Sequence, residues 1–436
     1  MAHLENHGEL LRIDREVSIV HEIAAYIRKS SDVGGPAFLF ENVKGYKGWT
    51  VAGGVYAKRA RISRALATNI DEVVHRYVRG TSKPIPPKIV RKTARNHVVW
   101  EGNQVDLSKI PIVTHSARDS GGFITAGVQV AKNPATKIRA LGIHRMQIKG
   151  RNRLGLLIPA TKRFGRALEA AEYMDIPLEI ATAIGVDPYT ALASVARVPH
   201  ALDKYDIAGG IKDAPISLVK CETIDIEVPL GSEIIIEGEI LPGIRETEGP
   251  FGEVEGCYSG QSNSPVVQVK RITMREDPIY LTALTGLPET DNHVMKWPST
   301  CETAYRAATS SYSNPDVRSV NLINGWLVIA IKKRHSGEPS NVLHSVLSSI
   351  SEKYCLVVDD DVNIYDPSEI EWVFRTRVQP AENVQIFPRM QGTTLDPSSP
   401  SVRLTSKLGI DGTLPVGADR LKFEKVTVPG SESVSW

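Results

Sequence analysis

Two glutamates stand five residues apart in residues 248–253 (EGPFGE), a segment that cannot form a regular helix or strand. The two glycines and the proline between them interrupt backbone hydrogen bonding, so we expect a tight loop. Such a loop can hold Glu248 and Glu253 close to one site. If both are buried, their pKa values separate and one carboxyl group stays protonated as a general acid. The alternative is a surface turn with two solvated acids, the commoner location of charged loop residues.

Arg145 ends the strand-like segment 142–145 (GIHR). Its guanidinium could pair in a bidentate way with a carboxylate of the protein or of a substrate. Alternatively, it lies on the solvent-exposed face of a strand. Residues 145–166 carry seven basic side chains and no acidic one. This local excess could neutralise a phosphate group, or it could be a solvated basic face.

Three consecutive aspartates, residues 359–361, are a further chemical candidate, because clustered carboxylates suit hard cations. They follow an expected buried strand and precede an expected capped helix. Acids in such places commonly serve turns and helix starts. We therefore assign them a structural role and expect no metal there.

The composition excludes several classes of function. The 436 residues carry 52 basic and 50 acidic side chains, a net charge of +2, and aromatic residues make up only 6%. Nucleic-acid binding usually needs a basic excess and stacking aromatics, so we expect no nucleic-acid partner. Apolar runs fall far short of the roughly 20 residues that cross a bilayer, so we expect no membrane span. The four cysteines form no C-x-x-C pair, which favours a reducing, cytoplasmic location.

The elements that must position these residues follow from apolar periodicity. Helical spacing predicts helices over residues 17–30, 58–68 and 164–174. Strands are predicted over residues 37–40, 123–130, 141–148, 178–184, 221–240, 265–285 and 353–358, with a turn at residues 276–278. Asp187 and Asp366, each followed by proline, predict two helix starts. The tail after residue 395, rich in Pro, Ser and Gly, is expected to run over the surface or onto a partner subunit.

The order of these elements indicates an α+β fold with a β-rich middle between two mixed α/β domains. We place the domains at residues 1–103, 104–300 and 301–436.

Seven segments of this chain are long and unusual in composition, and together they resemble the UbiD family of prenylated-FMN-dependent (de)carboxylases. They are residues 34–46 (GGPAFLFENVKGY), 123–130 (FITAGVQV), 142–150 (GIHRMQIKG), 219–229 (VKCETIDIEVP), 248–258 (EGPFGEVEGCY), 358–380 (VDDDVNIYDPSEIEWVFRTRVQP) and 406–413 (SKLGIDGT). The resemblance implies a central split β-barrel that binds the flavin. It also implies a C-terminal domain that helps to form a homodimer or homohexamer.

The same resemblance implies an activity and a catalytic set. The reaction would be a reversible, non-oxidative decarboxylation of an α,β-unsaturated or (hetero)aromatic acid, with prenylated FMN supplied by a flavin prenyltransferase. Glu253 would protonate the carbon that loses the carboxylate. Arg145 would orient the acids, and Glu248 would tune both partners. The implied cofactor-binding residues are Ile143, His144, Arg145, Lys162, Arg163 and Lys204.

His293 stands in a region that lines the substrate pocket of the family, and it could contact a second polar group of the substrate. The alternative is a histidine in a surface loop.

One departure from the family concerns the cofactor phosphate, which family members hold through a divalent metal and a potassium ion. In an ungapped alignment Ala140, Thr161 and Lys204 occupy the positions of the metal ligands, and none is a convincing ligand. We hypothesise that Lys204 pairs directly with the phosphate, assisted by Lys162 and Arg163. The alternative is a non-catalytic or flavin-free UbiD-like subunit that acts as a binding or assembly component.

Overall fold

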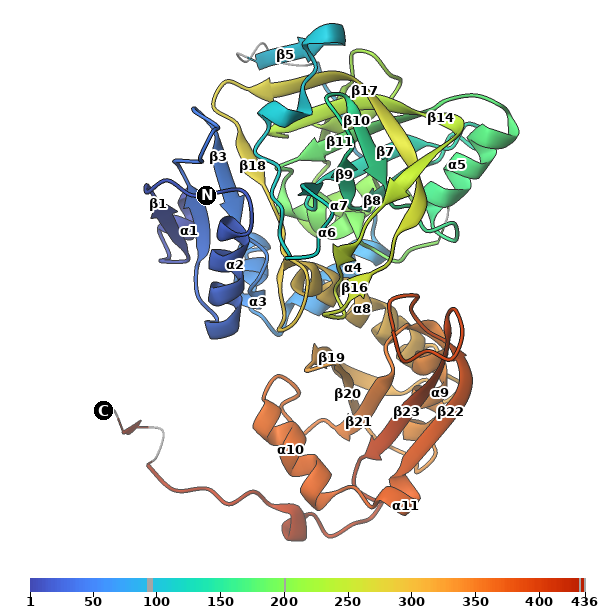
Figure 1. Cartoon of the computed structure of the whole chain (residues 1–436). Coiled ribbons are helices and arrows are strands. Elements are labelled where there is room, and N and C mark those ends of the chain that lie inside the picture. The colour runs from blue at the N-terminus through green and yellow to red at the C-terminus, as the bar shows by residue number, and fades with distance from the viewer. Residues whose placement is uncertain (92–96, 200, 431–432, 435–436) are drawn as a thin grey trace. The chain divides into compact units, whose positions relative to one another are not determined.

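The protein is described from a computed structural model, which covers residues 1–91, 97–199, 201–430 and 433–434. Two compact units divide the chain, Met1–Thr300 and Cys301–Trp436 (Figure 1). Each unit combines helices with sheets, which confirms the α+β expectation. None of the helices in the described ranges has both the length and the apolar character that a bilayer span requires.

The N-terminal part of the first unit is a small mixed sheet. Among the described residues its order is β1 (Leu10–Ile13), β2 (Ala37–Phe40), β3 (Thr50–Gly53) and β18 (Ile279–Leu281). A strand from far along the chain therefore completes a sheet that the first residues begin. β2 coincides with the predicted strand, and all of its residues are buried.

Helix α2 (Glu22–Val33) covers this sheet and begins later than predicted. The preceding residues are engaged elsewhere, because Val17 and Val20 form isolated bridges to Val43 and Thr114. The helix ends at Gly34, whose φ of 63° suits glycine at a helix C-terminus.

The other helices of the first unit surround the sheets. They are α1 (Ala2–Glu5), α3 (Arg59–Ala65), α4 (Val73–Ser82), α5 (Arg163–Tyr173), α6 (Pro188–Ser194), α7 (Lys204–Lys212), the start of α8 (Asp291–Thr309), and the 3-10 turns Gly102–Gln104 and Leu107–Lys109. Asp187 begins α6 as predicted, since its Oδ1 accepts a hydrogen bond from the Thr190 backbone N–H at 3.0 Å.

A large antiparallel sheet forms the middle of the chain (Figure 1). In the described residues its order is β6 (Phe123–Ile124), β9 (Met146–Ile148), β10 (Arg153–Leu156), β17 (Ser262–Arg275), β14 (Ile234–Glu248), β11 (Leu178–Ile184), β7 (Val128–Lys132) and β8 (Arg139–Ile143), with β5 (His97–Glu101) paired to β17. Strands β14 and β17 pair over most of their length, with register shifts after Glu237 and Ile240.

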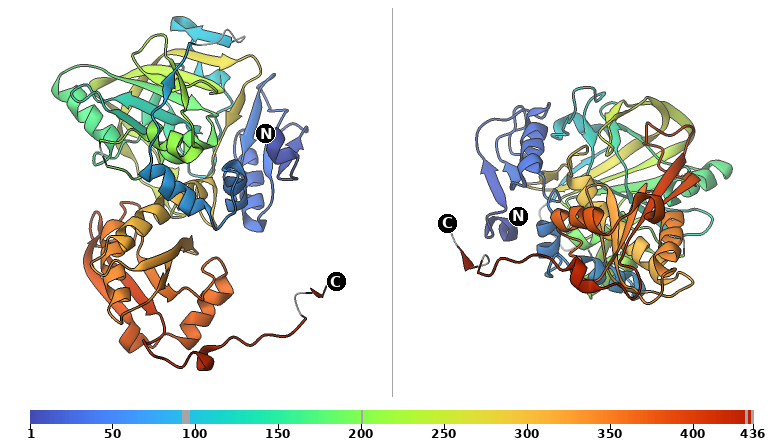
Figure 2. Two further views of the ribbon diagram at one scale, coloured as in Figure 1. Left: turned by 180° about the vertical axis from the view of Figure 1, so that it is seen from behind. Right: turned by 90° about the horizontal axis from the view of Figure 1, so that it is seen from below.

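The two ends of this sheet are brought together by one short connection. β8 lies at one end of the strand order and β9 next to the other end, yet only His144 and Arg145 separate them. Three Cα steps limit the distance from Ile143 to Met146 to about 11 Å. The sheet therefore curls into a half-barrel, which Figure 2 shows from two further sides. The predicted strand 141–148 is wrong in this respect, because it is broken where the barrel is split.

The predicted strand 221–240 is also interrupted. Its first part is a turn between β12 (Ser217–Lys220) and β13 (Glu227–Pro229), and β12 also pairs with β4 (Lys88–Ile89). The buried carboxylate of Glu237 accepts the backbone N–H of Thr223 at 2.7 Å and that of Glu222 at 3.1 Å. The Glu237 carboxylate therefore accepts hydrogen bonds from backbone amides that would pair with a neighbouring strand if the predicted strand were continuous.

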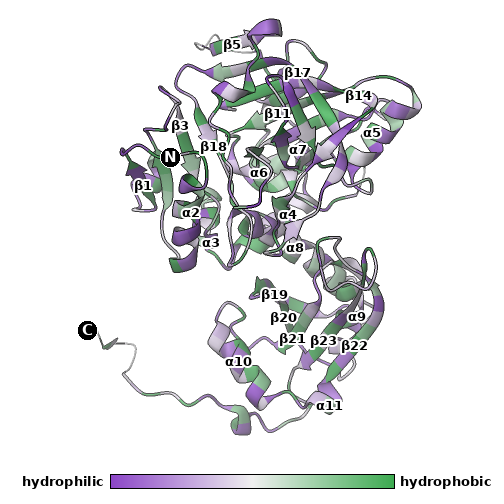
Figure 3. Ribbon diagram, viewed as in Figure 1, coloured by the Kyte–Doolittle hydropathy of each residue, from purple (hydrophilic) through white to green (hydrophobic). Residues whose placement is uncertain are grey.

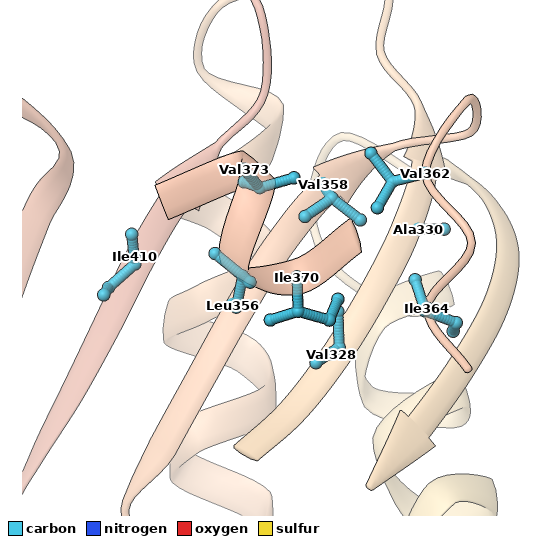
Figure 4. Packing of buried hydrophobic residues seen from close by; sticks show 9 residues of the cluster. All are labelled: Val328, Ala330, Leu356, Val358, Val362, Ile364, Ile370, Val373 and Ile410. Carbon is cyan, nitrogen blue, oxygen red and sulfur yellow. The ribbon is translucent and has the colours of Figure 1, made fainter. Parts of the chain in front are cut away.

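The second unit has one mixed sheet with helices on both faces. In the described residues the order is β19 (Asp316–Ile323), β20 (Trp326–Lys332), β21 (Tyr354–Asp359), β23 (Leu404–Gly412) and β22 (Val384–Gln391), with helices α9 (Glu338–Ser349), α10 (Pro367–Thr376) and α11 (Pro380–Asn383). Helix α10 begins at Asp366 as predicted, and its Ile370 and Val373 pack over Val328, Leu356 and Val358 (Figure 4). Figure 3 shows hydrophobic residues concentrated on the inner strands β20 and β21.

The tail after residue 395 differs in part from the expectation. Leu404–Gly412 is not a surface segment but strand β23, which pairs with β21 on one side and β22 on the other. From residue 413 to residue 430 the chain runs out largely in extended form, with a 3-10 turn at Arg420–Phe423 (Figure 2). Two of the three aspartates at 359–361, Asp359 and Asp361, are ion-paired with Arg377.

Candidate active site

Arg145 and Glu248 form a buried bidentate ion pair. Nε and Nη2 of Arg145 donate to the two carboxylate oxygens of Glu248, each at 2.7 Å. The Arg145 side chain is only 7% exposed and that of Glu248 is fully buried. Arg145 stands in the break between β8 and β9, and Glu248 is the last residue of β14. The curl of the sheet therefore brings together two side chains that are far apart in sequence.

Glu253 contacts the remaining edge of the same guanidinium, since Nη1 of Arg145 donates to Glu253 Oε1. The backbone N–H of Glu253 donates to the Cys257 carbonyl at 2.9 Å, which closes a tight turn. Nη1 of Arg145 also donates to Ser259 Oγ at 3.0 Å. The three residues that the sequence singled out thus lie at one place, on strand ends and one short loop. The surface-turn reading of the two glutamates is wrong for this structure.

The loop between the two glutamates depends on its glycines. Gly249 has a φ of 86°, and a Cβ there would stand 2.7 Å from the carbonyl oxygen of Gly260. Gly252 donates its N–H to Asp119 Oδ1 at 2.9 Å, and a Cβ there would stand 2.7 Å from Ser116 Oγ. Backbone therefore approaches backbone too closely for any larger residue at Gly249.

The electrostatic surroundings of Glu253 favour its neutral form. Burial raises the pKa of Glu253 above its ordinary value, and the positive charge of Arg145 acts in the opposite direction without cancelling the shift. The Arg145 guanidinium lies over the ring of Phe251, with its central carbon 4.9 Å from the ring centroid. The site therefore pairs a fixed cation with a carboxyl group that can carry a proton.

The candidate cofactor-binding residues gather at the same end of β8. Ile143 ends that strand and His144 follows it. Lys204, at the start of α7, donates from Nζ to the Leu141 carbonyl of β8 at 2.9 Å. Burial, aided by the charges of Lys204 and Lys162, lowers the pKa of His144 to about 4, so its ring is neutral at physiological pH.

Arg163, the first residue of α5, lies close enough to Lys204 to lower its pKa. Its Nη1 donates to the Leu202 carbonyl at 2.5 Å and its Nη2 to that of Val198 at 3.1 Å. The predicted phosphate-binding cations Lys162, Arg163 and Lys204 are therefore near one another in the structure.

The residues at the expected metal site do not fit a divalent cation. Ala140 is buried in β8 and offers only a methyl group, and Thr161 is exposed before α5. The third position holds an ammonium, which repels cations. Among the described residues, no group of three or more His, Cys, Asp or Glu side chains could hold a metal ion.

The residues present do fit a flavin nucleotide. Gln129 of β7 is fully buried, and its Oε1 accepts the backbone N–H of His144 at 2.7 Å. Its Nε2 has no hydrogen-bond partner in the described part of the chain. A flavin ring has carbonyl and nitrogen acceptors for such a donor, and a flavin phosphate needs the cations described above.

His293 lies in the first turn of α8, beside the Glu253 turn. The Thr290 backbone N–H donates to His293 Nδ1 at 3.3 Å, and the backbone of Val254 forms a hydrogen bond with the ring. Burial lowers the pKa of His293 to about 4, with Lys296 acting in the same direction. The histidine is half-buried rather than in an open surface loop.

Several residues of the site were missed by sequence reasoning. Gln147 accepts the Gly249 backbone N–H at 3.3 Å, and its position two residues after Arg145 is a signal that could have found it. Ser259 and Asp119 also hold the loop, through the contacts given above. Lys296, which is exposed on α8, favours the ionised form of Glu253. No local sequence pattern identifies Ser259, Asp119 or Lys296 as residues of the site.

Comparison with family models accounts for most of the chain. Residues 1–80 match the 3-octaprenyl-4-hydroxybenzoate carboxy-lyase N-terminal domain of the UbiD family. Residues 88–288 match its Rift-related domain, and residues 315–412 match its C-terminal domain.

Individual relatives agree with this. The anhydromevalonate phosphate decarboxylase of Methanothermobacter thermautotrophicus is 34% identical over 434 residues, which cover 96% of this chain and 97% of the relative. The UbiD-class enzyme HmfF from Pelotomaculum thermopropionicum, solved in complex with FMN, is 36% identical with a TM-score of 0.92, covering 100% of this chain and 97% of that chain. The vanillic acid decarboxylase of Sedimentibacter hydroxybenzoicus is 29% identical with a TM-score of 0.85, covering 99% and 95%. This chain therefore belongs to the UbiD family of prenylated-FMN-dependent decarboxylases.

Proposed function

We propose that this protein decarboxylates an α,β-unsaturated or (hetero)aromatic carboxylic acid reversibly and without net oxidation. The observation that carries the proposal is the buried set in which Arg145 holds both Glu248 and Glu253. A structural ion pair needs one acid, whereas this guanidinium is shared with a second, whose pKa is raised. Perturbed carboxyl groups beside a fixed cation are typical of acid–base catalysis.

Glu253 is the proposed proton donor. Prenylated FMN, when bound, would supply an electrophilic carbon as the electron sink for the carbon–carbon bond that breaks. Carbon dioxide leaves, and the Glu253 carboxyl group donates its proton to the substrate carbon that carried the carboxylate. The Glu253 carboxylate then regains a proton from solvent, so the net change is loss of carbon dioxide and gain of one proton. Carboxylation uses the same groups in reverse.

Arg145 and Glu248 are proposed to position that proton. The bidentate pair fixes the guanidinium plane, because both oxygens of Glu248 are engaged at 2.7 Å. The third guanidinium edge then defines where Glu253 stands. When Glu253 has given up its proton, the same guanidinium stabilises the carboxylate.

The flavin is proposed to lie along the end of β8. Ile143, His144 and Arg145 would border its ring, and Lys162, Arg163 and Lys204 would face its phosphate. His293, beside the Glu253 turn, is proposed to border the substrate as a neutral ring. The M. thermautotrophicus relative is named for a phosphorylated acid and the S. hydroxybenzoicus relative for an aromatic one.

We also propose that a flavin prenyltransferase supplies the cofactor and that the chain forms a homo-oligomer. An evolved form of HmfF is dimeric, which supports the second statement.

A catalytically silent binding or assembly subunit is the second candidate. It is favoured by one observation, the loss of all three expected metal ligands at Ala140, Thr161 and Lys204. Such a subunit would have no reason to keep a buried Glu–Arg–Glu set.

Co-expression with a flavin prenyltransferase separates the two candidates. The purified protein is expected to show a modified-flavin absorbance spectrum and to release carbon dioxide from members of a panel of cinnamate-like, phenolic and heteroaromatic acids. A protein that never carries flavin, whatever the expression conditions, would favour the silent subunit.

A further inference from the structure

The ammonium of Lys204 is held between two other elements and retains one donor. Nζ donates to the carbonyl of Leu141 in β8 at 2.9 Å and to that of Ser194, the last residue of α6, at 2.5 Å. An ammonium carries three N–H donors. The described residues provide no third partner, so one donor is available to a ligand.

Lys204 and Arg163 lie near each other, and neither is paired with a carboxylate among the described residues. Arg163 donates to backbone carbonyls, and neither it nor Lys204 forms an ion pair with any described residue. Asp203 attracts Arg163 but is held by Arg139, with Nη1 and Oδ2 2.6 Å apart. Burial, together with the charges of Arg163 and Lys162, lowers the pKa of Lys204 to about 7. Partly buried cations without a counter-ion are costly, so an anion would stabilise Lys204 and Arg163.

The cluster lies at a suitable place for the phosphate end of a flavin. Leu141, whose backbone carbonyl accepts the hydrogen bond from Lys204, stands four residues before Arg145. Four Cα steps limit the distance between them to about 15 Å, a span that an extended FMN, from its ring to its phosphate, can cover. One end of the flavin can therefore face the catalytic set while the other faces Lys204.

We infer that Lys204 binds the flavin phosphate directly, and that this chain holds that phosphate without a divalent cation. The inference rests on the proposed function, because it takes flavin to be the ligand of the half-barrel. Ala140 cannot coordinate a metal, and the ammonium occupies the place from which a carboxylate would. A single side-chain charge thus replaces a metal ion and its ligand.

This arrangement has a signature that a metal site lacks. Free Lys204 loses its proton near pH 7, whereas a phosphate dianion stabilises the ammonium and raises its pKa in the complex. The complex therefore binds more protons than the free protein above pH 7, and the affinity for FMN falls as pH rises. Of the groups around Lys204, His144 is already neutral in this range, while Arg163 and Arg139 stay charged. The other charged side chains that face it are those of Lys162 and Asp203.

The test is flavin binding by the full-length protein purified without a prenyltransferase. Titrations with FMN and with riboflavin, which lacks the phosphate, are followed by flavin fluorescence from pH 7 to 9, with and without EDTA. The affinity for FMN is expected to fall by up to tenfold per pH unit above pH 7 and to be the same with and without EDTA. The affinity for riboflavin is expected not to change with pH. Stoichiometric divalent metal in the protein, with FMN binding abolished by EDTA, would overturn the inference.

Variants give a second measurement. Lys204→Met is expected to weaken FMN binding about 10- to 100-fold, the effect of losing one charge-assisted hydrogen bond, and to remove its pH dependence. Riboflavin binding should persist, which shows that the variant is folded. Lys212→Met, an exposed lysine at the end of the same helix, is the matched control and should change neither. Equal FMN affinity in Lys204→Met and wild type would contradict the inference.

The outcomes distinguish this inference from the proposed function. Metal-free, Lys204-dependent FMN binding in a protein that releases no carbon dioxide after prenylation would leave the inference standing and remove the function. Decarboxylation that requires a bound metal would support the proposed function and contradict the inference about Lys204.

Discussion

Arg145 and Glu248 meet through two parallel hydrogen bonds of 2.7 Å, although they are 103 residues apart in sequence. Closure of the half-barrel creates this contact, because Arg145 occupies the break at the split and Glu248 ends the longest strand. The pair engages both oxygens of Glu248. The two glutamates are therefore unequal, and Glu253 is the one left to move a proton.

Breaking this pair should destabilise the first unit. Glu248→Ala leaves a buried guanidinium without its bidentate partner, and we expect a loss of about 3–5 kcal/mol in the free energy of unfolding. Urea denaturation followed by tryptophan fluorescence measures it. Glu72→Ala, which removes an exposed partner of Arg79 in the same unit, is the control and should leave the midpoint unchanged. Similar denaturation midpoints for the two variants would contradict the claim that the buried Arg145–Glu248 pair stabilises this unit.

Turnover should depend on the protonation of Glu253. Its pKa is raised by burial, so the neutral acid persists to a higher pH than for an ordinary glutamate. Above that raised pKa, kcat is expected to fall tenfold per pH unit, because only the protonated form can deliver a proton. A kcat profile measured with saturating substrate tests this. A profile that rises with pH over the same range would assign Glu253 to the opposite role, that of a base.

The turn between the glutamates should not tolerate a Cβ at Gly249. Gly249→Ala is expected to lower kcat at least tenfold, since the methyl group would stand 2.7 Å from the Gly260 carbonyl and displace Glu253. Gly243→Ala shares the left-handed backbone, with a φ of 69°, but has open space around it. The left-handed backbone alone should cost each variant about 1–2 kcal/mol of stability, and the close contact adds to this loss only in Gly249→Ala. Equal turnover in the two would show that the close contact is irrelevant to catalysis.

Asp291 should make stability depend on pH. It is fully buried at the start of α8, where it accepts the backbone N–H groups of Tyr56 at 2.8 Å and Leu284 at 3.2 Å. Burial raises its pKa to about 6. Below the pKa of an unfolded aspartate both states are protonated. Between that value and 6 the folded state holds the extra proton, so stability falls as pH rises, by roughly 3 kcal/mol in total.

Thermal unfolding from pH 4 to 7 measures this contribution. Asp291→Asn keeps one acceptor and cannot ionise, so its melting temperature should vary less over this range than that of wild type. If the two proteins show the same pH dependence, another group is responsible.

The sequence predicted the site residues better than the elements that hold them. The loop at 248–253 was recognisable because its glycines and proline are local signals. The pairing of Arg145 with Glu248 came from family resemblance, since nothing local relates a residue in the break after β8 to the last residue of β14. The break at His144 leaves a trace in the sequence, because the apolar alternation changes phase there, from Leu141 and Ile143 to Met146 and Ile148. The prediction of one continuous strand overlooked this change of phase, which would place the two halves on opposite faces of a single strand. Strand β23 was hidden by its Pro- and Ser-rich neighbours, since its place depends on partners far away in sequence.

The central claim, that Glu253 delivers the proton, is tested most directly by Glu253→Gln in protein loaded with prenylated FMN. We expect carbon dioxide release to fall by 100- to 10,000-fold, the usual contribution of a general acid, with the flavin spectrum and melting temperature unchanged. Glu255→Gln, an exposed residue of the same turn, should behave as wild type. Turnover of Glu253→Gln within a few-fold of wild type would contradict the account.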